Sequence, residues 1–393
     1  METEYKDIDI LINNKNNKKF DLPDFKVSSG CAVFGIINKN GKRFSGGQII
    51  EGISLMHERS NGLGGGFAAY GIYDDFSDYW AFHIIYDDMY ARKQTEEELN
   101  NVFKIIYGEE IPTKNVPTIK NPLPVYRYFL TIRDTKNLFI QSEEDFIVKF
   151  VMKINSSRIG SYIISSGKNM GIFKGVGFPE DIGSYFKLDQ YEGYIWTAHG
   201  RFPTNSVGWW GGAHPFGLLN WSVVHNGEIS SYGRNKRFVE SFGYECSLLT
   251  DTEVIIYLFD LLVRRKKINI EILNLILAAP LWEYIEQMPE EEKKLAKVLR
   301  IVYGGALLNG PFSIIVSNGQ FLYALNDRIK LRPLVAANKQ DFLYVSSEES
   351  AIRAVCPNPD FIWRPDGGIP VISFIEEHKI KQQNIKNKKI VSL

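Results

Sequence analysis

The sequence VSSG at residues 27–30 is followed abruptly by CAVFGII at residues 31–37. The first 30 residues are polar and rich in Asn, Lys and Asp, whereas CAVFGII is a nearly continuous apolar run. A short apolar run of this kind predicts a strand that is buried on both faces. The composition therefore changes at the bond between Gly30 and Cys31, and Cys31 stands at the head of the first predicted strand.

A lone cysteine at the head of a buried strand is most often a small core residue. The position of Cys31 at the change in composition favours a functional role over a purely structural one. If the peptide bond before Cys31 is cut, the new α-amino group has a pKa near 8 and acts as a general base for its own thiol at neutral pH. Nucleophile and base then come from one residue, and no partner histidine is needed.

The composition favours a globular protein that acts on small, weakly charged substrates. The chain has 393 residues, 44% of them hydrophobic, and 46 basic residues balance 46 acidic ones. A zero net charge gives no electrostatic footprint for nucleic acid or for an anionic membrane. No apolar stretch reaches the roughly 20 residues of a spanning helix, and the N-terminus lacks a signal peptide, so we expect a cytoplasmic protein.

The three cysteines are too few and too scattered for a disulfide framework or a zinc cluster. The chain also has no dinucleotide fingerprint and no iron-sulfur cysteine spacing. We therefore expect neither a metal nor a cofactor in this chain.

The remaining pattern divides the chain into a main domain, an insertion and a tail. A helix is predicted over 48–59, and the glycine-rich SNGLGGGFAAYGIY at 60–73 must turn tightly and resume as a strand. Short helices and strands alternate over about 87–193, which we interpret as an inserted α/β subdomain. Helices near 268–304 and strands in the last third complete a domain over 31–375, and 376–393 is a basic tail.

The segment WSVVHNGEI at 221–229 predicts a strand that runs into Asn-Gly. Alone, this dipeptide is typical of a hairpin corner. The functional alternative is an oxyanion hole, in which the Asn226 side-chain amide and the Gly227 backbone N–H face an oxygen that becomes negative in a tetrahedral intermediate. A glycine at 227 lets the backbone approach closely, because it has no Cβ.

Two further segments offer groups that recognise an amino acid. In HGRFPT at 199–204, Arg201 lies at a predicted strand end, where its planar fork suits a carboxylate. In TDTE at 250–253, Thr250 and Glu253 fit a capping box before a helix. Asp251 is not needed for that box, so its carboxylate is available to hold an ammonium group.

These segments together resemble the class II glutamine amidotransferase domain. The resemblance rests on Cys31, HGRFPT at 199–204, AHPF at 213–216, HNGEI at 225–229 and TDTE at 250–253, and it extends over about 31–375 through NDRIKLRPL and SSEESAI. The segments HERSNGLGGGFAAYGIY, GIFKGVGFPEDIGSYF and HGRFPTNSVGWWGGAHPF are most similar to the amidotransferase subunit of archaeal-type glutamate synthases.

The resemblance implies a fold, a reaction and a set of residue roles. The fold is a four-layer αββα N-terminal-nucleophile hydrolase sandwich, here with the insertion. Cys31 forms an acyl-enzyme with L-glutamine, Asn226 and Gly227 form the oxyanion hole, and Arg201 and Asp251 bind the substrate's carboxylate and amino groups, assisted by Thr204. Ammonia then passes to a synthase subunit on a separate chain, a flavin and iron-sulfur glutamate synthase subunit.

Two features depart from the family pattern. Thirty residues precede Cys31, so activity requires their removal as a propeptide, and the insertion has no counterpart in shorter members. The alternatives are an amidotransferase-like subunit of a glutamate N-methyltransferase complex, a non-catalytic glutamine-binding regulatory subunit that retains residues 1–30, and an autoprocessed peptidase or acylase. A peptidase or acylase would not need Arg201 and Asp251.

Overall fold

The computed structural model describes residues 30–133, 142–202 and 208–376. Among these residues the largest sheet has seven antiparallel strands in the order β17-β15-β16-β1-β10-β3-β8. The predicted first strand is confirmed, because every residue of β1 is buried. The strands of this sheet are β1 (Ala32–Asn38), β3 (Gly65–Tyr70), β8 (Met170–Gly175), β10 (Ile195–Gly200), β15 (Val335–Lys339), β16 (Phe342–Ser346) and β17 (Phe361–Trp363).

A second antiparallel sheet packs against the first. Its order is β11-β12-β13-β14-β18, with β11 (Phe216–Leu218), β12 (Trp221–Gly227), β13 (Phe312–Ser317), β14 (Phe321–Asn326) and β18 (Val371–Phe374). A Cβ on Gly35 of β1 would lie 3.1 Å from Leu322 and 3.2 Å from Ile315. Alternate residues of the second sheet, including Val224, therefore share one core cluster with β1.

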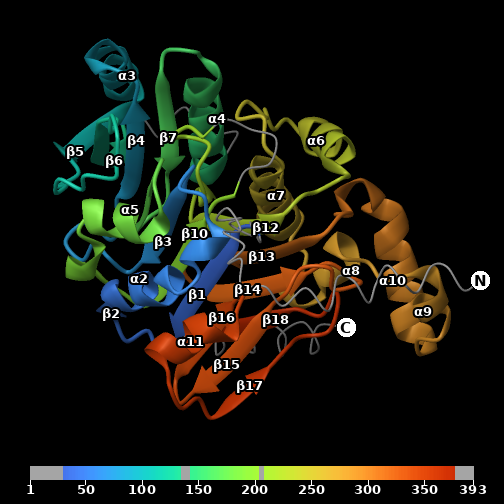
Figure 1. Cartoon of the computed structure of the whole chain (residues 1–393). Helices are drawn as coiled ribbons and strands as arrows, with labels where there is room; N and C mark the ends of the chain where they lie inside the picture. The colour runs from blue at the N-terminus through green and yellow to red at the C-terminus, as the bar shows by residue number, and fades with distance from the viewer. Residues whose placement is uncertain (1–29, 134–141, 203–207, 377–393) are drawn as a thin grey trace, which may run out of the picture.

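Helices cover the outer faces of both sheets, which gives four layers (Figure 1). The first sheet contacts α2 (Gly47–Ser54), α5 (Pro179–Tyr185) and α11 (Glu349–Val355). The second sheet contacts α7 (Asp251–Phe259), on which α6 (Tyr232–Glu240) packs. The expected four-layer αββα architecture is confirmed. The helix predicted over 48–59 divides into α2 and a 3-10 turn over His57–Arg59.

A third sheet forms a separate lobe beside the sandwich (Figure 1). Its order is β5-β6-β4-β7, with β4 (Trp80–Tyr86), β5 (Phe103–Glu110), β6 (Val125–Ile132) and β7 (Ser161–Ser165), and it carries α3 (Met89–Val102) and α4 (Glu143–Ser156). The insertion expected over about 87–193 overlaps this lobe. The lobe begins earlier, at β4, and the chain returns to the seven-stranded sheet at β8.

The remaining strands and helices lie outside the three sheets described above. Strands β2 (Phe44–Ser45) and β9 (Glu192–Gly193) pair with each other, and α8 (Asn274–Leu277), α9 (Trp282–Glu286) and α10 (Glu290–Val302) lie between α7 and β13 in sequence. No helix among the described residues is long and apolar enough to cross a membrane.

Candidate active site

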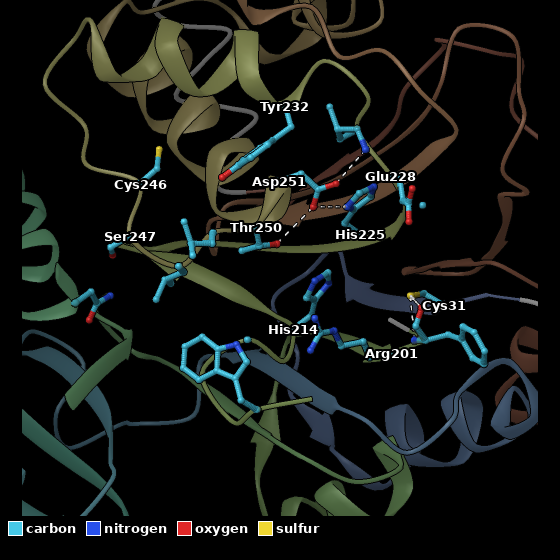
Figure 2. A pocket seen from close by; sticks show the side chains of 18 of the residues that line it. Cys31, Arg201, His214, His225, Glu228, Tyr232, Cys246, Ser247, Thr250 and Asp251 are labelled. Carbon is cyan, nitrogen blue, oxygen red and sulfur yellow. Dashed lines mark hydrogen bonds and ion pairs between the residues drawn. The ribbon is translucent and has the colours of Figure 1, made fainter. Parts of the chain in front are cut away.

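A cavity of about 1090 Å³ brings four of the sequence-predicted residues together (Figure 2). Cys31 immediately precedes β1, Arg201 follows β10, Gly227 ends β12 and Asp251 begins α7. Both sheets and one helix therefore end at this cavity. The nucleophile candidate and the two candidates for binding an amino acid share one space, although they are far apart in sequence.

Cys31 is held by the backbone at the Arg201 end of β10. The Phe202 N–H donates to Cys31 Sγ at 3.2 Å. Burial raises the pKa of the Cys31 thiol, while the Phe202 hydrogen bond and the Arg201, Arg332 and Arg59 guanidinium groups lower it. Because burial prevails, a proton acceptor is needed to generate the thiolate.

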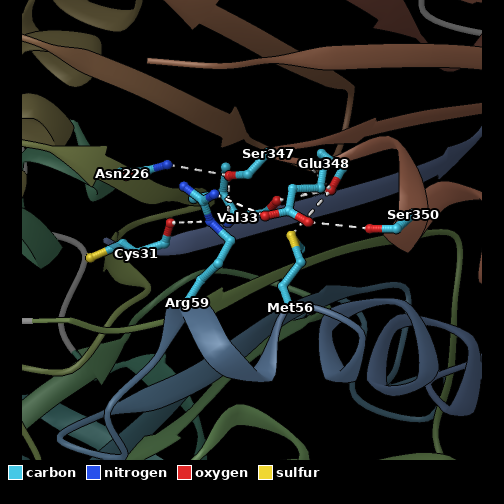
Figure 3. Close-up of polar contacts among 9 residues, drawn as sticks. Cys31, Val33, Met56, Arg59, Asn226, Ser347, Glu348 and Ser350 are labelled. Carbon is cyan, nitrogen blue, oxygen red and sulfur yellow. Dashed lines mark hydrogen bonds and ion pairs between the residues drawn. The ribbon is translucent and has the colours of Figure 1, made fainter. Parts of the chain in front are cut away.

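A second set of contacts fixes the backbone of Cys31 (Figure 3). Arg59 Nε donates to the Cys31 carbonyl oxygen at 3.2 Å, and Arg59 Nη1 donates to Glu348 Oε1 at 2.9 Å. The sequence did not suggest Arg59 or Glu348 as site residues. They lie in HERSNGLGGGFAAYGIY and SSEESAI, two segments of the resemblance, but 28 and 317 residues beyond Cys31, so their contacts arise only in the folded chain.

Arg201 is 8% exposed and lines the same cavity as the thiol of Cys31 and the carboxylate of Asp251 (Figure 2). Burial lowers the pKa of its guanidinium, against the charges of Cys31 and Asp251, which raise it. Its backbone N–H donates to the Gly64 carbonyl at 2.8 Å. The glycine-rich segment is required here, because a Cβ on Gly66 would lie 2.3 Å from the His214 carbonyl oxygen.

Asp251 keeps a negative charge at the cavity wall. Its Oδ2 accepts from the Ile229 N–H at 3.0 Å, and its Oδ1 lies 3.6 Å from His225 Nδ1. Burial raises the pKa of this carboxyl, but His225 and the hydrogen bonds from Ile229 and Thr252 outweigh burial and hold the pKa at about 2. The carboxylate is thus ionised at neutral pH and suits an ammonium group.

The cap of α7 differs in one respect from the predicted box. Thr250 is the N-cap, and its Oγ1 accepts from the Thr252 N–H at 3.3 Å. Glu253 does not reach back to Thr250; it accepts from the Ser247 and Leu248 N–H groups at 3.1 and 2.9 Å. The loop before the cap turns its own unpaired N–H groups toward the helix start, and these are the donors that Glu253 satisfies.

Asn226 and Gly227 lie in a strand and not at a hairpin corner, since they pair with Ser313 and Phe312 of β13. Gly227 lines the cavity, has φ of +132° and leaves no room for a side chain, because a Cβ would lie 1.9 Å from the Pro311 carbonyl oxygen. The Asn226 side chain is fully buried beside the cavity. Thr204 lies outside the described residues.

Three histidines stack on one another, and two of them, His214 and His225, line the cavity. The rings of His199 and His214 are 4.0 Å apart, and His199 Nε2 is 2.9 Å from the His225 carbonyl oxygen. Burial lowers the pKa of His199 to about 3 and that of His214 well below its usual value. These two rings are neutral at physiological pH, which agrees with a structural role.

The third sheet supplies one wall of the cavity. Asn155, Ser156 and Arg158 at the end of α4 and Tyr162 of β7 line it. Tyr162 packs edge-on against Trp209 with ring centroids 4.9 Å apart. Of the two tryptophans in NSVGWWGG, Trp209 therefore faces the cavity, whereas Trp210 is 5% exposed and packs in the core. The insertion belongs to the site and not only to the surface.

Sequence comparisons agree with this geometry. The family model "Glutamine amidotransferases class-II" matches residues 135–251. An uncharacterized protein of Archaeoglobus fulgidus is 50% identical over 368 residues, which cover 92% of this chain and 96% of that protein. A putative glutamine amidotransferase of Methanothermobacter thermautotrophicus is 25% identical over 83% of this chain and 93% of its own length. By the family match, the chain carries a class II glutamine amidotransferase domain.

The chain is also 26% identical to the glutamate synthase [NADPH] large chain of Bacillus subtilis, over 56% of this chain and 15% of that protein. The similarity therefore concerns a small part of the synthase.

Within the described part of the chain, no group of three or more His, Cys, Asp or Glu side chains is arranged to hold a metal ion.

Proposed function

We propose that the mature chain hydrolyses L-glutamine to glutamate and ammonia with Cys31 as the nucleophile. The observation that carries this proposal is the shared cavity, in which a thiol, a guanidinium and an ionised carboxylate meet. An amino acid with an amide on its side chain offers one complementary group to each of them. The match of residues 135–251 to the class II glutamine amidotransferase model supports the same reaction.

The proposed reaction begins with removal of residues 1–30, which gives Cys31 a free α-amino group. This amine accepts the thiol proton, and the thiolate attacks the γ-carbonyl carbon of glutamine. The tetrahedral intermediate collapses, the C–N bond breaks, and the amine's proton leaves with the departing nitrogen as ammonia. Water then attacks the thioester, the C–S bond breaks, and glutamate and the free thiol are released.

The roles of the other residues follow from their charges. Arg201 binds the α-carboxylate and Asp251 the α-ammonium group, since each has the opposite charge. Gly227 N–H and the Asn226 amide stabilise the oxyanion of the intermediate. For Thr204 we propose an assisting contact with the substrate, on the basis of the sequence motif alone.

We further propose that the ammonia is used by a synthase on a separate chain. The similarity to a glutamate synthase large chain supports a flavin and iron-sulfur glutamate synthase subunit as that partner. The second candidate is that the chain itself is the amidotransferase-like subunit of a glutamate N-methyltransferase complex, because that subunit resembles the same domain. Proteins that co-purify with the chain from its native cells would distinguish the two.

The reaction is tested by intact-mass measurement together with a glutaminase assay. We expect the purified chain to lose residues 1–30 and to release glutamate from glutamine, and Cys31→Ala to abolish both activity and thioester formation. Cys356→Ala is the matched control, since Cys356 is buried and does not line the cavity. It should keep wild-type activity.

Two outcomes would contradict the proposal in different ways. A chain that retains residues 1–30 and still hydrolyses glutamine would exclude the free amine as base. A chain that retains residues 1–30, binds glutamine and releases no glutamate would favour the non-catalytic regulatory subunit.

A further inference from the structure

Ser347, in the loop that follows β16, forms hydrogen bonds both to β1, the strand after Cys31, and to Asn226 of β12 (Figure 3). The Ser347 N–H donates to the Val33 carbonyl oxygen at 3.0 Å, and the Val33 N–H donates to Ser347 Oγ at 3.1 Å. Ser347 is thereby clamped to β1, two residues beyond Cys31. Its side chain is 2% exposed, so bulk water does not compete for these hydrogen bonds.

The same hydroxyl is the hydrogen-bond partner of Asn226. Asn226 Nδ2 lies 3.3 Å from Ser347 Oγ, and the Asn226 side chain is fully buried. The other amide atom, Oδ1, has no hydrogen-bond partner among the described residues. A buried polar atom without a partner is rare in folded proteins and calls for an explanation.

A count of protons shows which amide orientation fits best. With Nδ2 toward Ser347, the hydroxyl oxygen accepts two hydrogen bonds, from Val33 and Asn226. The hydroxyl proton and Asn226 Oδ1 then have no partner within the described part of the chain. The two ends of an amide have nearly the same shape, so the side chain fits equally well when rotated by half a turn.

In the rotated orientation the Ser347 hydroxyl donates to Asn226 Oδ1 and still accepts from the Val33 N–H. Of the hydrogen-bonding groups on the Asn226 and Ser347 side chains, the Asn226 NH₂, a donor, is then the one without a partner among the described residues. A donor that is fixed in place and unpaired before substrate binds is what stabilises an oxyanion.

We propose that Ser347 is a positioning residue that turns the Asn226 amide so that its N–H groups face the γ-carbonyl oxygen of glutamine bound at Cys31. This inference rests on the proposed function and adds a specific determinant of the transition state. Because Ser347 is also clamped to β1, the donor and the nucleophile are held by one residue at a fixed separation.

A structural role alone would give a different result in a double-mutant cycle. If Ser347 acts through Asn226, its hydroxyl has no catalytic value once the amide is gone. If the hydroxyl merely stabilises β1 through Val33, its loss lowers activity by the same factor with or without Asn226.

The experiment compares mature wild type, Ser347→Ala, Asn226→Ala and the double variant by kcat and KM for glutamine. Asn226→Ala should lower kcat by about 10²- to 10³-fold, as loss of one oxyanion donor does. Ser347→Ala should lower kcat by roughly 10-fold or more with KM within about twofold, and should change kcat less than about twofold in the Asn226→Ala background. Ser347→Cys, a weaker donor of similar shape, should lie between and replaces Ser347→Ala if that variant does not fold.

Ser313→Ala is the matched control. Ser313 is fully buried, pairs with Asn226 across β12 and β13, and its hydroxyl has no hydrogen-bond partner among the described residues. Its kcat should stay within about twofold of wild type. An equal loss in Ser313→Ala and Ser347→Ala, or an unchanged factor for Ser347→Ala in the Asn226→Ala background, would overturn the inference for Ser347 alone. An inactive mature wild type would instead overturn the proposed function, and this inference with it.

Discussion

Replacing Lys174 by methionine should change how the stability of the protein depends on pH. Lys174 of β8 is 1% exposed and its Nζ donates to the Gly211 and Pro215 carbonyl oxygens at 2.8 and 3.2 Å. Burial lowers the pKa of Lys174 to about 7, reinforced by the charge of Arg201 and opposed by that of Glu253. The turn that leads from Trp209 to His214 is thus tied to the sheet by a lysine that titrates near neutrality.

The magnitude follows from the two pKa values. In the unfolded chain a lysine has a pKa of about 10.4, so between pH 7 and pH 10 the unfolded state binds more protons than the folded state. The free energy of unfolding therefore rises with pH in this window, while below pH 7 the folded protein bears the full cost of the buried charge. At 1.36 kcal/mol per pKa unit, the rise from pH 7 to pH 9 is about 2 kcal/mol.

Urea denaturation at pH 7, 8 and 9 measures this contribution as a difference between wild type and Lys174→Met. Methionine fills the same volume without titrating, so the variant should lack the rise of about 2 kcal/mol that Lys174 contributes. Lys294→Met, at an exposed position of α10, is the control and should follow the wild-type profile. Parallel profiles for wild type and Lys174→Met would refute the argument, because they would mean that Lys174 stays charged in the folded protein.

Two further predictions concern substrate binding. Asp251→Asn keeps an oxygen that accepts from the Ile229 N–H but loses the negative charge. The KM for glutamine should therefore rise roughly 10- to 100-fold, with a smaller change in kcat, as measured by steady-state kinetics. A loss confined to kcat would mean that Asp251 acts in the chemical step. Tyr162→Ala removes the ring that packs against Trp209 and should raise the KM for glutamine about 2- to 10-fold. Tyr284 of α9 is 60% exposed, so Tyr284→Ala should leave KM unchanged. Equal KM values for wild type and both variants would mean that the insertion takes no part in substrate binding.

Local patterns in the sequence predicted the elements that depend on neighbouring residues. The apolar run after Cys31 is a buried strand, and Thr250 caps α7 as expected. The partners of Glu253 were not predictable in the same way, because the capping pattern does not show that the preceding loop presents its N–H groups. Asn-Gly at 226–227 favoured a turn, but pairing with β13 across the sheet overrides that preference.

Contacts between distant segments could not be predicted from the sequence. Ser347 and Asn226 are 121 residues apart, and nothing in the residues around either one indicates the other. The contribution of Tyr162 to the cavity wall was equally unpredictable, because an alternation of helices and strands predicts a subdomain but not which surface that subdomain faces. The sequence pointed to two charged residues, Arg201 and Asp251, that line the cavity, whereas only the fold shows which groups hold them in place.

The position of β1 in its sheet also sets the order of events during synthesis. Cys31 is made early, but its strand lies between β10 (Ile195–Gly200) and β16 (Phe342–Ser346). Such distant pairings form late, because long loops must close before the contacts stabilise them. Translation must therefore pass β16 before the Cys31 strand can pair on both sides. A nascent chain that ends before β16 has neither the complete cavity nor the hydrogen bonds between Ser347 and Val33. The surroundings of Cys31 therefore form late in folding, although Cys31 itself precedes most of the residues that surround it in the sequence.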